Sequence, residues 1–273
     1  MKIAFCIFGF ARTIHNTDTI IKSLKKSLPT NSTIDIFWHC PTLLDSEGDI
    51  YINKDELINN FVDAHLGNVN ISFFEYDPIQ FYDKVIELGF TIKSIQNINP
   101  TLSRQFSAFY NQSKSINLAY KYSKENSIEY DWVVLTRNDY IPYIINFGVP
   151  DSNNIKTKGV YIYRTSPYRT SLEQTQNGVL DTEDRGYFGS PEYMLELRNF
   201  YDTLHNIYKK NDNLCIDKLY PENIHTLFFY YSCGADLCYY IEGSNIQFLP
   251  NRKTIAERSA TNNEIEYYIR NKK

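Results

Sequence analysis

The chain alternates between short, wholly apolar runs and longer segments in which apolar residues recur every three or four positions. The apolar runs predict buried strands, and they fall at residues 3–8, 33–38, 69–74, 131–136 and 160–164. The periodic segments predict helices, and they fall at residues 17–28, 54–64 and 102–124, with a further helix opened by Asp77 and Pro78. Strands that alternate with helices are typical of an α/β fold with a mainly parallel central sheet flanked by helices.

The pattern becomes irregular in the second half of the chain. Residues 165–183 are rich in turn-forming residues and too long for an ordinary connection, so we expect an active-site loop or lid there. Helices are expected near 191–208 and 221–231, and a last strand at 246–249. Because no repeat and no linker-like composition interrupts the chain, residues 1–273 are expected to form a single domain.

Composition narrows the class of protein. The chain is 42% hydrophobic and 22% charged, as in a soluble globular protein with an ample core. A net charge of −4 gives no general attraction to nucleic acid, and no apolar run reaches the length of a transmembrane segment, so neither is expected. The five cysteines are an odd number beside apolar runs, which favours buried thiols in a reducing, cytoplasmic compartment over disulfides or a zinc site.

Polar residues follow two of the predicted strands at the point where each strand ends. Arg137, Asn138 and Asp139 come directly after the fourth apolar run, and His39 follows the second. The carboxyl ends of parallel strands meet at one edge of the sheet, where α/β proteins bind ligands. Asp139 is therefore the first candidate for chemistry, although Arg137 and Asp139 are also consistent with a simple salt bridge at a strand end.

Five residues besides Arg137 and Asp139 are candidates for ligand binding near this edge. The first strand is followed by Gly9 and Arg12; a glycine turn lets backbone amides approach a ligand, and a guanidinium can grip a phosphate. The same two residues are consistent with an ordinary turn. His39 is a candidate contact for a base or ribose, or else a structural group. Gln105 and Lys114 belong to the long helix and either reach the edge or face solvent.

Several short motifs occur in an order that resembles a known family. They are Gly9-Phe10-Ala11-Arg12, residues 35–39, 105–110 and 130–139, and Asp184-Arg185 before residues 188–190. Over roughly residues 3–258 the chain resembles GT-A-fold glycosyltransferases found in bacterial surface-polysaccharide clusters and large DNA viruses. The resemblance implies transfer of a sugar from a nucleotide-sugar donor, UDP-linked in the simplest case, to a hydroxyl of a glycan or glycoconjugate. It also implies a donor half at about 1–140 and an acceptor half at about 141–258.

The resemblance bears directly on metal binding. GT-A enzymes usually hold a divalent cation with an Asp-x-Asp motif after a strand, and the cation balances the charge that grows on the departing diphosphate. Here the triplet is Arg137-Asn138-Asp139, which resembles an Arg-x-Asp variant with a single carboxylate. This implies either that Asp139 binds Mn²⁺ or Mg²⁺, or that Arg137 itself supplies part of the positive charge.

Asp184 is the candidate on the acceptor side that the resemblance implies. Inverting transfer needs a base to accept the proton of the attacking hydroxyl, and a carboxylate in a loop suits that role. Capping of the next helix is the competing role for Asp184, with Ser190 as the better cap. For His225, Arg252 and Arg258 a surface role is favoured over a late phosphate or metal contact.

Two other classes of protein remain open. A dinucleotide-binding oxidoreductase also begins with a strand and a glycine turn, but it requires Gly-x-Gly-x-x-Gly, and this chain has Gly9 alone at that point. A non-catalytic carbohydrate-binding or scaffold protein is the stronger alternative, because fold does not fix function and one carboxylate of the metal motif is missing.

Overall fold

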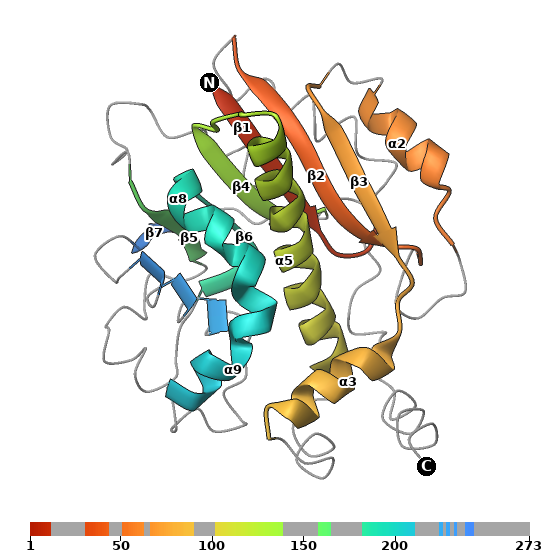
Figure 1. Cartoon of the computed structure of the whole chain (residues 1–273), viewed down its shortest axis with the longest axis vertical. Helices are drawn as coiled ribbons and strands as arrows, with labels where there is room; N and C mark the ends of the chain where they lie inside the picture. Colours follow the sequence, from red (N-terminus) through yellow and green to blue (C-terminus); the bar gives the residue numbers. More distant parts are fainter. Residues whose placement is uncertain are drawn as a thin grey trace.

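A sheet of seven strands, in the order β3-β2-β1-β4-β6-β5-β7, forms the centre of the described chain (Figure 1). The structure is a computed structural model. It describes residues 1–11, 31–43, 51–62, 66–89, 102–138, 158–164, 182–210 and 238–242, together with 224, 225, 228, 229, 232 and 233.

Four neighbouring strands of the sheet run parallel. They are β3 (Val69–Phe74), β2 (Thr33–Pro41), β1 (Lys2–Phe8) and β4 (Trp132–Arg137). Beyond β4, β6 (Thr182–Gly189) is antiparallel to both of its neighbours, β4 and β5 (Val160–Arg164), and β7 (Cys238–Glu242) is parallel to β5. The predicted α/β class with a mainly parallel sheet is therefore confirmed.

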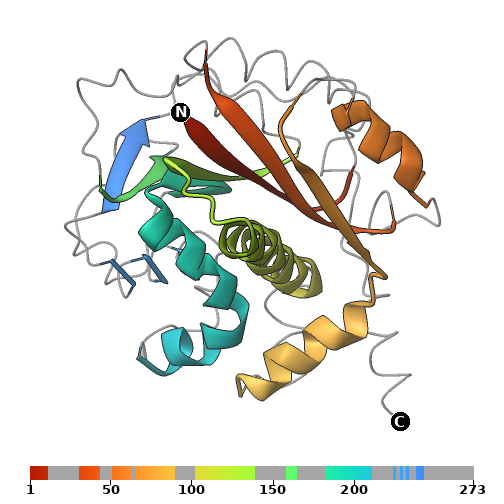
Figure 2. The ribbon, with the colours of Figure 1, turned by 45° about the horizontal axis from the view of Figure 1, so that its top comes forward.

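Helices cover both faces of the parallel part. On one face lies α5 (Leu102–Glu125), between α3 (Pro78–Glu87) and the continuous run α8 (Pro191–Met194), η2 (Leu195–Asn199) and α9 (Phe200–Lys210) (Figure 2). On the other face α2 (Lys54–Val62) packs Phe61 against Trp38 of β2, with 6.1 Å between the ring centroids. Strand residues alternate between the two cores, so that Phe8 and Leu135 lie on the α5 side.

Polar residues of α5 are buried at the helix-sheet boundary and bond to backbone groups. Ser115 Oγ donates to Ile7 O at 2.6 Å and accepts from His39 N at 2.9 Å. Ser113 Oγ accepts from Tyr201 N at 2.9 Å, which joins α5 to α9. Burying a hydroxyl costs little when it is hydrogen-bonded, so α5 can pack tightly although many of its buried residues are polar.

The predicted boundaries agree with the structure for most of the described elements. The five predicted strands are present, and the helices expected at 54–64 and 102–124 appear as α2 and α5. Asp77 is the N-cap of α3 and accepts from Ile79 N at 2.9 Å. The helix expected near 191–208 appears as the α8, η2 and α9 run. The segments predicted at 17–28 and 246–249, and most of 221–231, lie outside the described residues.

Ser190 stands at the N-cap position of α8, as expected, but its hydroxyl is used differently. Ser190 Oγ accepts from Gly159 N at 2.8 Å and donates to Gly159 O at 3.1 Å, so it caps no helical amide. Gly189 lies just before it, and a Cβ there would come within 2.4 Å of Gly159 O. This glycine therefore allows the close approach of β6 to the start of β5.

Two strands were not predicted. Residues 182–189 form β6 instead of a loop, because Tyr187 and Phe188 are buried between β4 and β5 and their backbone pairs with both neighbours. The three charged residues at the start of β6 conceal this pattern in the sequence. The strand β7 (Cys238–Glu242) was not predicted either, because the last strand was expected at residues 246–249.

Cysteine placement agrees with the expectation of buried thiols. Cys6 and Cys40 are buried and free, and Cys233 is free and partly buried. Burial raises the pKa of the Cys6 and Cys40 thiols, which keeps them protonated and unreactive. Within the described residues, no helix combines the length and apolar character needed to cross a membrane.

Candidate functional site

The sequence order of the parallel strands reverses at β1, the strand that lies between β2 and β4. The chain proceeds from β1 to β2 and β3 on one side, and β4 lies on the other side. The β2–β3 connection carries α2 over one face of the sheet, and the β3–β4 connection carries α3 and α5 over the other, so the connections change face between β1 and β4. This is the topological switch point, the place where open α/β sheets bind their ligands.

Gly9 follows β1 at this point and has a backbone φ of +90°. Among the described residues, no heavy atom lies within 4 Å of a Cβ built on Gly9, so none of them fills the space beside it. Its carbonyl accepts from Trp38 Nε1 at 3.2 Å, which ties the turn to β2. The predicted glycine turn is present, and its position leaves room for a ligand to approach the backbone.

A matched pair of glycine variants separates a binding role for this turn from its role in stability. Gly89, after α3, has a φ of +94° and also an open Cβ direction. We expect Gly9→Ala and Gly89→Ala each to lower the free energy of unfolding by about 1–2 kcal/mol, because a side chain disfavours left-handed backbone. Only Gly9→Ala should weaken nucleotide binding, measured by titration calorimetry. Equal nucleotide affinity in both variants would remove Gly9 from the site.

On the other side of the switch point, β4 ends in Arg137, whose backbone is level with Phe8 of β1. Arg137 follows Val133 and Leu135 in alternation, and those two residues face α5, so Arg137 is on the same face. Asn138 comes next and is buried, at 6% exposure. Asp139 and Arg12 lie outside the described residues.

Asp184 belongs to β6 and not to a loop, so that part of the prediction is wrong. The pairing of β6 with β4 brings the backbone of Gly186 opposite Thr136, one residue before the end of β4. Asp184 comes two residues before Gly186, in the stretch of β6 where the pairing with β5 shifts register between Tyr187 and Thr182. Helix capping is excluded for Asp184, because Ser190 holds the cap position.

His39 lies within β2, which continues to Pro41, and it points to the α5 face. Its Nδ1 lies 2.7 Å from Ser72 Oγ, and its ring stacks on Phe74 at 4.8 Å. Tyr110 of α5 meets the ring edge-on at 5.5 Å. The Nε2 atom is buried and has no hydrogen-bond partner among the described residues. A buried polar atom of this kind is costly unless something binds it.

Electrostatics keep His39 neutral. Burial, and to a lesser degree the charge of Lys114, lowers the pKa of His39 from 6.5 to about 4. Lys114 Nζ itself lies 5.1 Å from the centre of the Tyr110 ring. The structure therefore brings His39 and Lys114 together on the α5 side of the sheet edge, with Lys114 as the positive charge and His39 as a neutral group for hydrogen bonding. Gln105 is buried near the start of the same helix.

The low pKa of His39 predicts how stability depends on pH. Between pH 4 and 6.5 the unfolded chain binds a proton at His39 that the folded chain does not, so the free energy of unfolding should rise with pH across this window and level off above it. We expect His39→Gln to reduce that slope in urea unfolding at pH 4.5 and 7.5. His205→Gln is the control, because His205 is exposed on α9. An unchanged slope in His39→Gln would show that His39 is not neutral in the fold.

His225 is a polar residue whose burial was not predicted from the sequence. It is fully buried, bonds to Gln112 of α5, and is surrounded by the rings of Phe109, Tyr187 and Phe200 at 4.6–5.1 Å. The expected surface role is therefore wrong for His225. Arg252 and Arg258 lie outside the described residues.

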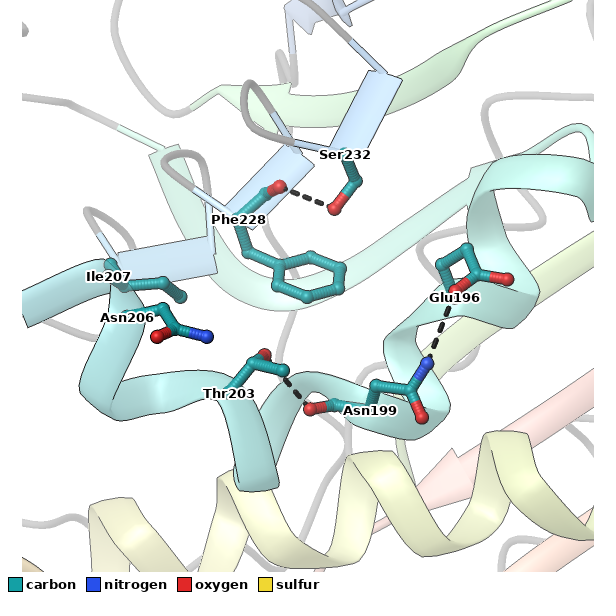
Figure 3. A pocket seen from close by; sticks show the side chains of 7 residues that line it. All are labelled: Glu196, Asn199, Thr203, Asn206, Ile207, Phe228 and Ser232. Carbon is teal, nitrogen blue, oxygen red and sulfur yellow. Dashed lines mark hydrogen bonds between the residues drawn. The ribbon is translucent and has the colours of Figure 1, made fainter. Parts of the chain in front are cut away.

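Within the part of the chain that the structure describes, the best-defined pocket lies apart from the sheet edge, and no acidic cluster adds to it. A pocket of about 410 Å³ lies away from it, between η2, α9 and residues 228–232, and shares no lining residue with it (Figure 3). The described residues contain no group of three or more His, Cys, Asp or Glu side chains that could hold a metal ion.

Comparisons with known proteins assign no family to this chain. No protein-family model matches the chain, and no curated protein matches it. Among solved structures, the chain is similar to the galactosyltransferase LgtC in complex with donor and acceptor sugar analogues. The two share 13% sequence identity with a TM-score of 0.41, over 88% of this chain and 73% of that one. A likeness of this degree assigns neither family nor activity, so the case for a function depends on the geometry of the sheet edge.

Proposed function

We propose that this chain is a glycosyltransferase with a GT-A-like fold, which moves a sugar from a nucleoside-diphosphate donor to a hydroxyl of a glycan or glycoconjugate. The observation that carries the proposal is the switch point between β1 and β4, where an open glycine turn and a strand-end arginine stand on adjacent strands. A diphosphate is bound by backbone amides and positive charge, and the turn at Gly9 and the side chain of Arg137 are the candidates for these two contributions.

Each candidate residue has a role in this proposal. Gly9 and Arg12 contact the nucleotide end of the donor, and Arg137 supplies positive charge to the diphosphate as negative charge develops on it. His39, neutral and with Nε2 unpartnered among the described residues, offers a hydrogen bond to the base or ribose. Lys114 adds a second positive charge from α5. Gln105, near the start of that helix, is a further candidate contact to the nucleotide-sugar donor.

Asp139 and Asp184 complete the proposed chemistry. Asp139 follows β4 by two residues and is the carboxylate that would hold Mn²⁺ or Mg²⁺ together with phosphate oxygens and water, which suits a hard cation. The cation supplies charge neutralisation to the diphosphate when bound. Asp184 is the proposed base that accepts the proton of the attacking hydroxyl, and its support is that it comes two residues before Gly186, which pairs with Thr136 near the end of β4.

Thermal stabilisation by nucleotides tests the proposal. A ligand that binds only the folded chain raises the melting temperature, and at one hundred times its dissociation constant it adds about 2.7 kcal/mol to stability. We expect a UDP-sugar or a GDP-sugar to stabilise the full chain, and Mn²⁺ to increase the effect if Asp139 binds the cation. No shift with any nucleotide would contradict the proposal and favour a non-catalytic carbohydrate-binding or scaffold protein.

A further inference from the structure

The pocket beside α9 has the size and lining of a ligand site, although it lies away from the sheet edge. Its volume of about 410 Å³ falls within the roughly 300–1,000 Å³ typical of small-molecule sites. Side chains from η2, α9 and the helical residues beyond 227 surround it (Figure 3). The lining residues are Glu196, Asn199, Thr203, Asn206, Ile207, Phe228 and Ser232.

The two hydroxyl groups of the pocket are oriented by the backbone. Thr203 Oγ1 donates to Asn199 O at 2.9 Å, and Ser232 Oγ donates to Phe228 O at 2.7 Å (Figure 3). Each hydroxyl has one proton, so both oxygens are left as hydrogen-bond acceptors toward a ligand. The amide of Asn206 is exposed and can both donate and accept. The pocket is therefore richer in acceptors than in donors, which suits a ligand with several O–H groups.

The charge of the pocket is already balanced. Glu196 Oε1 accepts from Arg198 Nη1 at 2.8 Å, and Glu196 Oε2 accepts from Asn199 Nδ2 at 3.2 Å. The Arg198 guanidinium in turn lies 4.0 Å from the centre of the Tyr120 ring. A phosphate or sulfate would meet the Glu196 carboxylate, and a cation would compete with Arg198. A neutral ligand is therefore favoured over either ion.

The floor of the pocket is apolar. Ile207 and Phe228 line it and are 3% and 6% exposed, so they present carbon surface between the polar groups. An apolar floor with a polar rim matches a sugar ring, which has C–H groups on its face and hydroxyls around its edge. We propose that this pocket binds one sugar residue of a glycan. In the transferase proposed above this would be a part of the acceptor remote from the reacting hydroxyl, and that assignment rests on the proposed function.

The test measures binding of methyl glycosides to the full chain without nucleotide. Saturation-transfer NMR with methyl glucoside, methyl galactoside and methyl N-acetylglucosaminide should show binding of at least one of them. We expect Asn206→Ala to weaken that binding about tenfold or more, which corresponds to 1.4 kcal/mol or more. His205→Ala is the matched control, because His205 is the exposed neighbour of Asn206 on α9 and does not line the pocket. It should bind as the unaltered chain does.

Three results would overturn the inference: no glycoside binds, Asn206→Ala binds as well as the unaltered chain, or glucosamine binds more tightly than glucose. The last would indicate a site for an ammonium group. Nucleotide stabilisation of the same variants separates this inference from the proposed function. Glycoside binding without any nucleotide effect would support the sugar pocket and contradict the proposed transferase function. Nucleotide binding without glycoside binding would support the transferase function and contradict the sugar pocket.

Discussion

Replacing Asp139 by asparagine is expected to lower the rate of sugar transfer by roughly 10²–10³-fold, the range seen when one electrostatic contact to a transition state is lost. The reason is that Asp139 is the single carboxylate of the strand-end triplet, and asparagine keeps its size while removing its charge. Transfer should be measured with the nucleotide sugar that stabilises the chain, together with the melting temperature, which is expected to stay nearly constant.

Asp131 is the matched control for this experiment because it stands at the opposite end of β4. Its Oδ2 accepts from Lys2 N at 2.6 Å, and an asparagine can preserve that contact. Asp131→Asn is therefore expected to retain full transfer. If Asp139→Asn transferred sugar as fast as Asp131→Asn, the proposed role of Asp139 would be wrong, whatever the effect on metal binding.

Replacing Phe109 by alanine is expected to lower the free energy of unfolding by about 3–5 kcal/mol, as for other large aromatic residues in a core. Phe109 is fully buried in α5, and its ring lies 5.1 Å from Phe200 of α9 and 5.1 Å from His225. Its loss would leave a cavity at the point where three segments meet. Urea unfolding followed by circular dichroism measures the change.

An exposed aromatic residue provides the comparison. The side chain of Tyr51 is 70% exposed, so Tyr51→Ala should change the free energy of unfolding by less than about 0.5 kcal/mol. A loss below about 1 kcal/mol in Phe109→Ala would mean that α5 and α9 are not packed as described. Transfer activity is not needed for this measurement, so it tests the fold independently of the proposed function.

Most of the parallel half of the fold could be predicted from the sequence because β1, β2 and β4 are buried on both faces. Such strands read as continuous apolar runs, as in residues 3–8 and 133–135, and these runs are too short for a typical helix. The antiparallel β6 could not be predicted in the same way. It begins with Thr182-Glu183-Asp184-Arg185, and what makes the segment a strand is the pairing of residues 186–189 with β4, which is distant in sequence, and of Thr182 and residues 187–189 with β5.

The position of the candidate site could be predicted, but its detailed contacts could not. The ends of β1 and β4 follow from the apolar runs, so Gly9 and Arg137 were expected at one edge. The state of His39 depends on Phe74, Tyr110 and Lys114, which come from three different parts of the chain. His225 shows the same limit, because its partner Gln112 lies 113 residues away in the sequence.

The hydroxyl of Ser115 limits how this protein can move when it takes up a ligand. It links α5 to β1 and β2 at once, through Ile7 O and His39 N, so sliding the helix along the strands would break two hydrogen bonds together. The helix and these strands should consequently behave as one rigid block.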